Sequence, residues 1–208
     1  AGLRYFSLGE VGLGGYDQDG EPVNSINPYE MAVDVAYSRM LSETFSAAVA
    51  LRFIYSDLAW NEAEDITPGS AFAADIAFYY NNYILLGQRE CMIGLGANIS
   101  NIGSKISYDE GNTSEFVPTN FRIGASLLIP IDEYNTISFS ADANKLLVPT
   151  RPMQAEDESD QDYQDRLQKD YYDLSPITGI FKSFNDAPDG FSEELKEIQW
   201  SVGAEYMY

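Results

Sequence analysis

Six charged residues lie within strand-like stretches of apolar and small residues, and they are the side chains best placed to do chemistry. They are Asp34, Arg52, Asp75, Arg122, Asp142 and Glu205. Charges at such positions could line a path for a polar solute. They could also pair with one another, because a buried charge needs a partner. We favour the ion-pair network, with Arg52 close to Asp34 or Asp75.

The residues that most catalytic and metal sites use are missing from the sequence. It has no histidine, and Cys91 is its one cysteine. A histidine base, a Ser-His-Asp or Cys-His arrangement and the usual zinc sites are therefore ruled out for these residues. Cys91 is expected on the apolar face of its strand as a small apolar residue. The sequence predicts no catalytic residue, no metal ligand and no cofactor.

The net charge of −21 limits the partners of the chain. So acidic a surface repels nucleic acid, which we exclude as a partner, and it disfavours adsorption to anionic headgroups. Fifteen tyrosines are present among 208 residues. Tyrosine is enriched at membrane interfaces, which makes membrane contact through another kind of surface a hypothesis to test against the pattern.

The stretch "FSAAVALRFIYS", at 45–56, alternates apolar residues with small or polar ones. A period of two indicates a β-strand with two unlike faces. Seven other stretches have a strand-like pattern, and most are long enough to cross a bilayer. The expected strands are Leu3–Val11, Tyr29–Leu41, Phe45–Asp57, Ala71–Asn81, Glu90–Ile102, Thr119–Ile131, Thr136–Leu147 and Ile198–Tyr208.

Short and long connections alternate strictly along the chain. The short ones are "SET", "NYILLGQR" and "DEYN", and the others are long. An up-and-down membrane barrel has this parity, whereas a Greek-key sandwich has no reason to keep it. The sequence thus favours an all-β, transmembrane, antiparallel up-and-down barrel over a soluble β-domain. In that barrel Arg52 faces the lumen, while Phe53 and Tyr55 face lipid.

The chain is expected to form a single domain over residues 1–208. Both ends look cut, so we expect a part of a longer barrel that lacks an N-terminal segment and C-terminal strands. Residues 148–197 form a long acidic connection that includes "AEDESDQDYQDRLQKDYYDL". Its composition predicts a solvated extracellular loop with one short helix. A loop of this length is uncommon without a binding or gating task.

Five stretches resemble the PorV family, also called LptO, of the type IX secretion system of Bacteroidetes. They are "NPYEMAVDVAYSRMLSETFSAAVALRFIYSDLA", "AFAADIAFYY", "GLGANISNIGSKISY", "FVPTNFRIGA" and, most distinctively, "DANKLLVPTRP". The similarity runs from about Tyr5 to Tyr208. It implies an outer-membrane, FadL-like barrel, 14-stranded in the family, of which this chain holds about eight strands.

The resemblance implies a role in transport rather than a reaction. Proteins of this family work beside the translocon barrel and bind cargo through its C-terminal signal domain. They then pass cargo to the surface proteins that remove the signal and attach the cargo to lipopolysaccharide. Cargo contact would lie in the outer loops, where aromatic and arginine side chains are the usual anchors. The candidates are Trp60, Tyr108, Phe116 and Arg151.

Two other functions stay open. A FadL-type transporter of hydrophobic solutes shares the fold, and fold alone does not decide function. An apolar inner pocket would favour that transporter, and a polar lumen with an ordered acidic outer loop would favour cargo binding. The third hypothesis is a lipopolysaccharide deacylase, which would need an activated nucleophile and finds no histidine base here.

Overall fold

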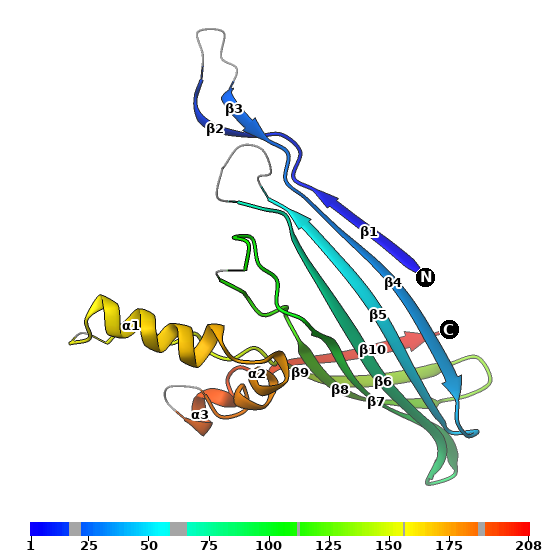
Figure 1. The fold of residues 1–208 in the computed structure, drawn as a ribbon. Helices are drawn as coiled ribbons and strands as arrows, with labels where there is room; N and C mark the ends of the chain where they lie inside the picture. Colours follow the sequence, from blue (N-terminus) through cyan, green and yellow to red (C-terminus); the bar gives the residue numbers. More distant parts are fainter. Residues whose placement is uncertain (17–21, 59–65, 112, 156, 187–189) are drawn as a thin grey trace.

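The structure is a computed structural model and describes residues 1–16, 22–58, 66–111, 113–155, 157–186 and 190–208. Its main element is an eight-stranded antiparallel sheet in which neighbours in the sheet follow one another along the chain, apart from an intervening hairpin (Figure 1). The strands of this sheet are β1 (Gly2–Ser7), β4 (Tyr29–Met40), β5 (Phe45–Asp57), β6 (Gly69–Leu86), β7 (Arg89–Gly103), β8 (Asn120–Pro130), β9 (Thr136–Leu146) and β10 (Gln199–Met207). The all-β, up-and-down prediction is therefore confirmed, and the sheet is open, with β1 and β10 at its edges.

Two regions differ from the predicted strands. The first predicted strand ends early, at Ser7, and the glycine-rich connection after it forms a separate hairpin of β2 (Val11–Tyr16) and β3 (Pro22–Ile26). In addition, β6 continues through "NYILL", which the sequence had suggested as part of a connection. The real turn is Gly87–Gln88, where Gly87 has φ +69°, a backbone conformation that glycine adopts without strain.

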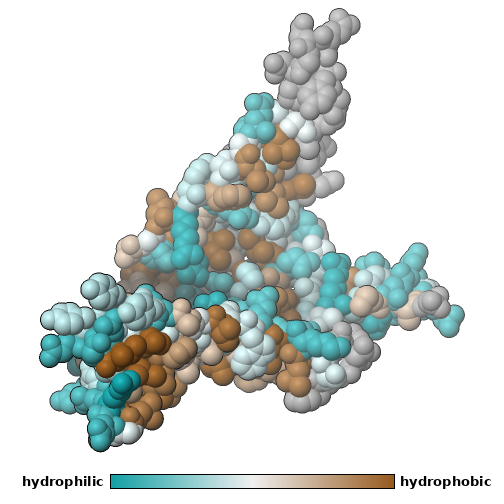
Figure 2. Space-filling view, turned by 180° about the vertical axis from the view of Figure 1, so that it is seen from behind, coloured by the Kyte–Doolittle hydropathy of each residue, from teal (hydrophilic) through white to brown (hydrophobic). Residues whose placement is uncertain are grey.

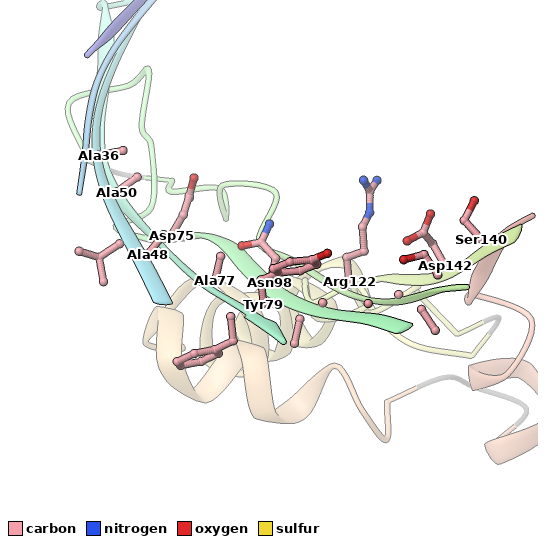
Figure 3. Close-up of a pocket in the computed structure, with 18 residues that line it drawn as sticks. Ala36, Ala48, Ala50, Asp75, Ala77, Tyr79, Asn98, Arg122, Ser140 and Asp142 are labelled. Carbon is pink, nitrogen blue, oxygen red and sulfur yellow. The ribbon is translucent and has the colours of Figure 1, made fainter. Parts of the chain in front are cut away.

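The two faces of the sheet separate polar from apolar side chains. In Figure 3, Asp75, Arg122, Asp142 and Ser140 project from the concave side of the curved sheet. Tyr79 also lines the concave surface, and the convex side carries most of the aromatic and branched residues of β4 and β5. There Tyr5, Tyr29 and Tyr55 lie side by side across three strands, with ring centroids 5.8 and 6.0 Å apart.

This tyrosine row marks one border of the convex apolar band. Tyr29 begins the apolar series of β4, and Tyr37 lies on the same face eight residues further along. Eight residues of strand span about 27 Å, or about 21 Å at a tilt of about 40°. That height is close to the ~25 Å apolar band of outer-membrane barrels, whose borders carry aromatic girdles. The convex face therefore has the form of a membrane-facing surface.

The strands have two ends. We call the end of the strands at which Tyr29 and Asp57 lie the loop end, and the end with the short turns the turn end. A helical segment at the loop end connects β9 to β10. It contains α1 (Asp160–Leu167), the π-helical turn η1 (Gln168–Tyr172), α2 (Pro176–Lys182) and α3 (Phe191–Glu194). The prediction of one short helix here was wrong. Ser159 and Ser175 cap α1 and α2 by accepting the N–H of the third residue on, and Pro176 follows the second cap.

The helical segment lies against the convex face of the sheet, opposite the charged concave side (Figure 3). Few large apolar residues are buried in the described part of the chain, and Leu167 of α1 and Tyr171 of η1 are among them. No helix among the described residues combines the length and apolar character that a membrane crossing requires.

Candidate functional site

Arg52 is at the centre of a charge cluster on the concave face. It lies on β5 directly opposite Asp34 of β4, and its Nη2 is 3.7 Å from Asp34 Oδ1 and 3.0 Å from Asp75 Oδ2. The three side chains are largely shielded, with exposed fractions of 13%, 22% and 19% for Arg52, Asp34 and Asp75. Two flanking carboxylates compensate the cost of desolvating the guanidinium.

Asn101 completes this cluster, and no feature of the sequence pattern predicts this role. Arg52 Nη1 donates to Asn101 Oδ1, and the Asn101 backbone N–H donates to Asp75 Oδ1 at 2.8 Å. Asn101 has φ +58°, which asparagine tolerates better than most residues. The pairing of β6 with β7 is irregular at this level, between Ala74 and Ile76. Asp75 thus fixes a β-bulge as well as a charge.

The other three inward charges do not join the Arg52 cluster. Arg122 Nε lies 3.4 Å from Asn144 Oδ1, and Asp142 is opposite Gly124 on the neighbouring strand. Glu205 is opposite Ser138 near the far edge. In the described residues, no ion pair links Arg122, Asp142 or Glu205 to one another. Alanine, glycine and serine line much of the concave surface between the charges (Figure 3).

A second cation lies on the opposite, convex face. Lys145 of β9 is the register partner of Phe121 and therefore shares its face. Its Nζ donates to Glu194 Oε2 at 2.7 Å and to Glu197 Oε2 at 2.5 Å. The Lys145 and Glu194 side chains are only 8% and 6% exposed. We call this arrangement the clasp, because it attaches the end of the helical segment to the sheet.

A second contact holds the middle of the helical segment. Lys105, just beyond β7, donates through Nζ to the carbonyls of Tyr171 and Tyr172 at 2.9 and 2.8 Å. The same ammonium lies 4.0 Å from the ring centroid of Phe116. Carbonyls at a helix end attract cations, and an aromatic face adds to that attraction. Burial lowers the pKa of Lys105, which the nearby Glu115 and Asp173 carboxylates partly offset.

Glu115 links this contact to the predicted loop residue Arg151. Its carboxylate accepts hydrogen bonds from Tyr171 at 3.0 Å and Tyr172 at 3.5 Å, and it lies 4.0 Å from Arg151 Nη1. Arg151 Nη2 also donates to the Tyr172 hydroxyl at 3.0 Å. Burial and the Glu115 carboxylate raise the pKa of Tyr171 to about 12, so this hydroxyl stays protonated as a donor.

The four predicted loop residues have different surroundings. Trp60 lies outside the described residues. Tyr108 packs beside Gly69 at the start of β6, and its carbonyl accepts the Thr67 N–H at 2.8 Å. Phe116 packs edge-on against Tyr171 at 5.3 Å and closely against Gly179 of α2. Arg151 keeps 53% of its side chain exposed. Of the three described candidates, the structure brings Phe116 and Arg151 together around Glu115 and η1.

These arrangements are suited to binding and positioning. The described residues contain no group of three carboxylate, cysteine or histidine side chains that could hold a metal ion. A curved up-and-down sheet with a polar concave face, a convex apolar band and a folded cap at one end defines an outer-membrane β-barrel protein.

The family follows from comparison with known proteins. The chain belongs to the PorV family, because the family model described as "Type IX secretion system protein PorV" matches residues 1–153. It is therefore an outer-membrane component of the type IX secretion system. The matched part includes the Arg52 cluster and Lys145 but ends before α1. No curated protein was found to match the chain.

Proposed function

We propose that the chain binds the C-terminal signal domain of secreted cargo beside the type IX translocon and passes the cargo to the surface proteins that process and attach it. In this proposal the loop end faces the outside of the cell, and the protein is not an enzyme. The role comes from the family resemblance, and one structural observation carries it. The long connection after β9 is a folded platform rather than a flexible tether.

The platform is held at separate points, which suits a docking surface. The clasp attaches its end through Lys145, and Lys105 attaches its middle through the carbonyls of η1. Arg151 lies beside these contacts with half of its side chain exposed. An arginine positioned by a carboxylate and a tyrosine loses little further entropy when it binds a partner. We therefore propose Arg151 as a cargo contact, with Phe116 and Tyr108 as nearby aromatic surface.

The concave face favours cargo binding over transport of hydrophobic solutes. A solute path for fatty acids would need an apolar lining. The described concave surface instead combines small residues with Asp75, Arg122 and Asp142. Two apolar grooves of the described residues lie on the convex side, one next to α2 and one beside Phe121 and Leu195.

The test is an affinity purification of the tagged full-length protein from detergent-solubilised outer membranes, with bound proteins and lipids identified by mass spectrometry. Arg151→Ala is compared with Arg166→Ala, which removes the same charge from α1 in the same segment. We expect the native protein to recover the translocon barrel and signal-bearing cargo, and Arg151→Ala to recover less cargo at equal barrel abundance. Recovery of the protein without cargo but with fatty acids would overturn the proposal in favour of transport.

A further inference from the structure

The helix α2 lies on the membrane-facing side of the sheet. Pro176 and Ile177 line a groove together with Leu51, Phe53 and Phe72, which belong to the convex apolar band. Phe53 and Phe72 are themselves in contact, with ring centroids 5.0 Å apart. The groove is therefore continuous with the surface that the strands present to lipid.

The groove also lies at the level of the membrane border. Phe53 precedes Tyr55 of the tyrosine row by two residues on the same face of β5. Tyrosine rows of barrels lie at the headgroup level, with the acyl chains directly below them. The N-terminal turn of α2 is thus next to the outermost layer of acyl chains.

Two large apolar side chains of α2, Ile177 and Phe181, are exposed rather than packed inward. Ile177 is 54% exposed and Phe181, one turn later on the same side of the helix, is 73% exposed. The helix is buried through Gly179 instead, whose backbone lies against the Phe116 ring. A Cβ at residue 179 would be 2.5 Å from Phe116 Cε1, so this close approach requires glycine. The burial of Gly179 fixes which side of α2 faces outward.

The helix α2 differs from its neighbour α1 in its content of charged residues. The sequence of α2, "PITGIFK", contains no carboxylate, whereas α1, "DQDYQDRL", contains three. Figure 2 shows α1 as a mainly hydrophilic arm that projects away from the sheet. Acidic residues would resist contact with a lipid surface, and the helix beside the apolar band is the one without them.

We propose that α2 is an interfacial helix that contacts the membrane at the loop end of the barrel. Ile177 and Phe181 lie among the acyl chains of the leaflet at that end. An acyl chain fills the groove between α2 and β4–β6. Clasp and Lys105 contacts hold the helical segment at this depth. The partner is the lipid surface itself, through its acyl chains and without headgroup specificity. This proposal does not depend on cargo binding.

The test labels introduced cysteines, and Cys91 is the one native cysteine among these 208 residues. Cys91 is fully buried and should not react with a nitroxide label in the folded protein. Phe181→Cys and Ile177→Cys are labelled in the full-length protein, reconstituted into dioleoylphosphatidylcholine vesicles. Gln161→Cys, exposed on α1, serves as the water reference, and Val202→Cys, on the convex face of β10, as the lipid reference. Spin-label relaxation by oxygen reports lipid, and relaxation by a water-soluble nickel complex reports water.

We expect the ratio of oxygen to nickel accessibility at residues 177 and 181 to be close to the ratio at residue 202 and clearly above the ratio at residue 161. A ratio at residue 181 equal to that at 161 would overturn the proposal, as would protection from both reagents, which indicates contact with protein. Heat-modifiable migration on gels identifies folded variants. If Phe181→Cys does not fold, Ile177→Cys, whose native side chain lines the groove, decides the question.

Discussion

Arg52 and Lys145 are two cations on opposite faces of one sheet, and each lies between two carboxylates. Arg52 belongs to the concave face, where its partners come from the adjacent strands β4 and β6. Lys145 belongs to the convex face, and its partners come from the helical segment, about fifty residues further along the chain. The first cluster joins strands that already pair through their backbones. The second joins the sheet to a segment that is otherwise held from outside the strands, through Lys105, Glu115 and Phe116.

The two clusters therefore have different structural roles. Loss of the Arg52 cluster leaves the ladder of backbone hydrogen bonds between β4, β5 and β6 in place. Loss of the clasp removes a principal contact of the helical segment with the sheet. Concave carboxylates also have access to water in the barrel, whereas Glu194 is almost fully shielded by protein. Loss of the cation should therefore have a larger effect in the clasp than in the Arg52 cluster.

Lys145→Met gives the largest expected effect. Removal of one partner of a buried ion pair costs about 3–5 kcal/mol, because the other charge stays buried without its cation. We expect rapid proteolysis within residues 148–197, while the barrel remains folded and heat-modifiable on gels. Lys196→Met, a change of the same residue type at an exposed position of the same connection, should leave the protease resistance unchanged.

The double variant Lys145→Met/Glu194→Gln sharpens this prediction. With the Glu194 charge removed as well, part of the lost protease resistance should return. Equal protease resistance of Lys145→Met and the native protein would show that the clasp does not hold the helical segment.

Arg52→Met should have a smaller effect, about 1–3 kcal/mol in the free energy of unfolding. Asp34 and Asp75 would face each other without the guanidinium, but both are partly open to solvent, which screens their repulsion. Urea unfolding in detergent micelles measures the change. The matched control is Arg122→Met on the same face, which should cost less. A larger loss for Arg122→Met than for Arg52→Met would contradict the assignment of the cluster.

Asp109 offers the smallest effect, and hydroxyl and backbone N–H donors hold its carboxylate. It accepts hydrogen bonds from the Thr113 hydroxyl at 2.6 Å, the Thr113 N–H and the Ser107 hydroxyl at 2.8 Å. These donors lower its pKa from 3.8 to about 2. The lowered pKa of the folded state means that this stabilisation is present above about pH 4 and is lost as the pH falls towards 2.

Carbon-13 NMR of labelled aspartate in micelles should show Asp109 titrating near pH 2, and Asp109→Asn identifies its signal. A midpoint near the usual value of 3.8 would show that neutral donors alone do not hold this turn.

The strands were predictable because alternation is a local signal. Phe45–Asp57 has the bounds that its pattern predicts, and the parity of Arg52 places it on the charged side. The predicted strand bounds were wrong where local signals conflict. Residues 82–86 mix asparagine with branched residues, and Gly12–Gly15 have the composition of a loop, yet both regions pair as strands.

The candidate site was less predictable, for a physical reason. The pairing of Lys145 with Glu194 depends on how the helical segment folds back over the convex face, which no local period encodes. Asn101 likewise acquires its role from a bulge in the sheet. The start of α2 did have a local signal, because Ser175 followed by Pro176 is the combination of an N-cap and a first helical residue.

The position of the helical segment within the chain bears on how the sheet assembles. The connections between neighbouring strands from β4 to β9 are much shorter than the one between β9 and β10. For example, residues 131–135 alone join β8 to β9. The pair β9–β10 must instead close a loop of about fifty residues, which costs about 2 kcal/mol more in chain entropy than that five-residue turn. Helices that form locally and fasten through Lys145 shorten this loop before β10 arrives. The helical segment thus brings β10 to the edge of the sheet beside β9, and a defect in this segment should slow the pairing of these two strands.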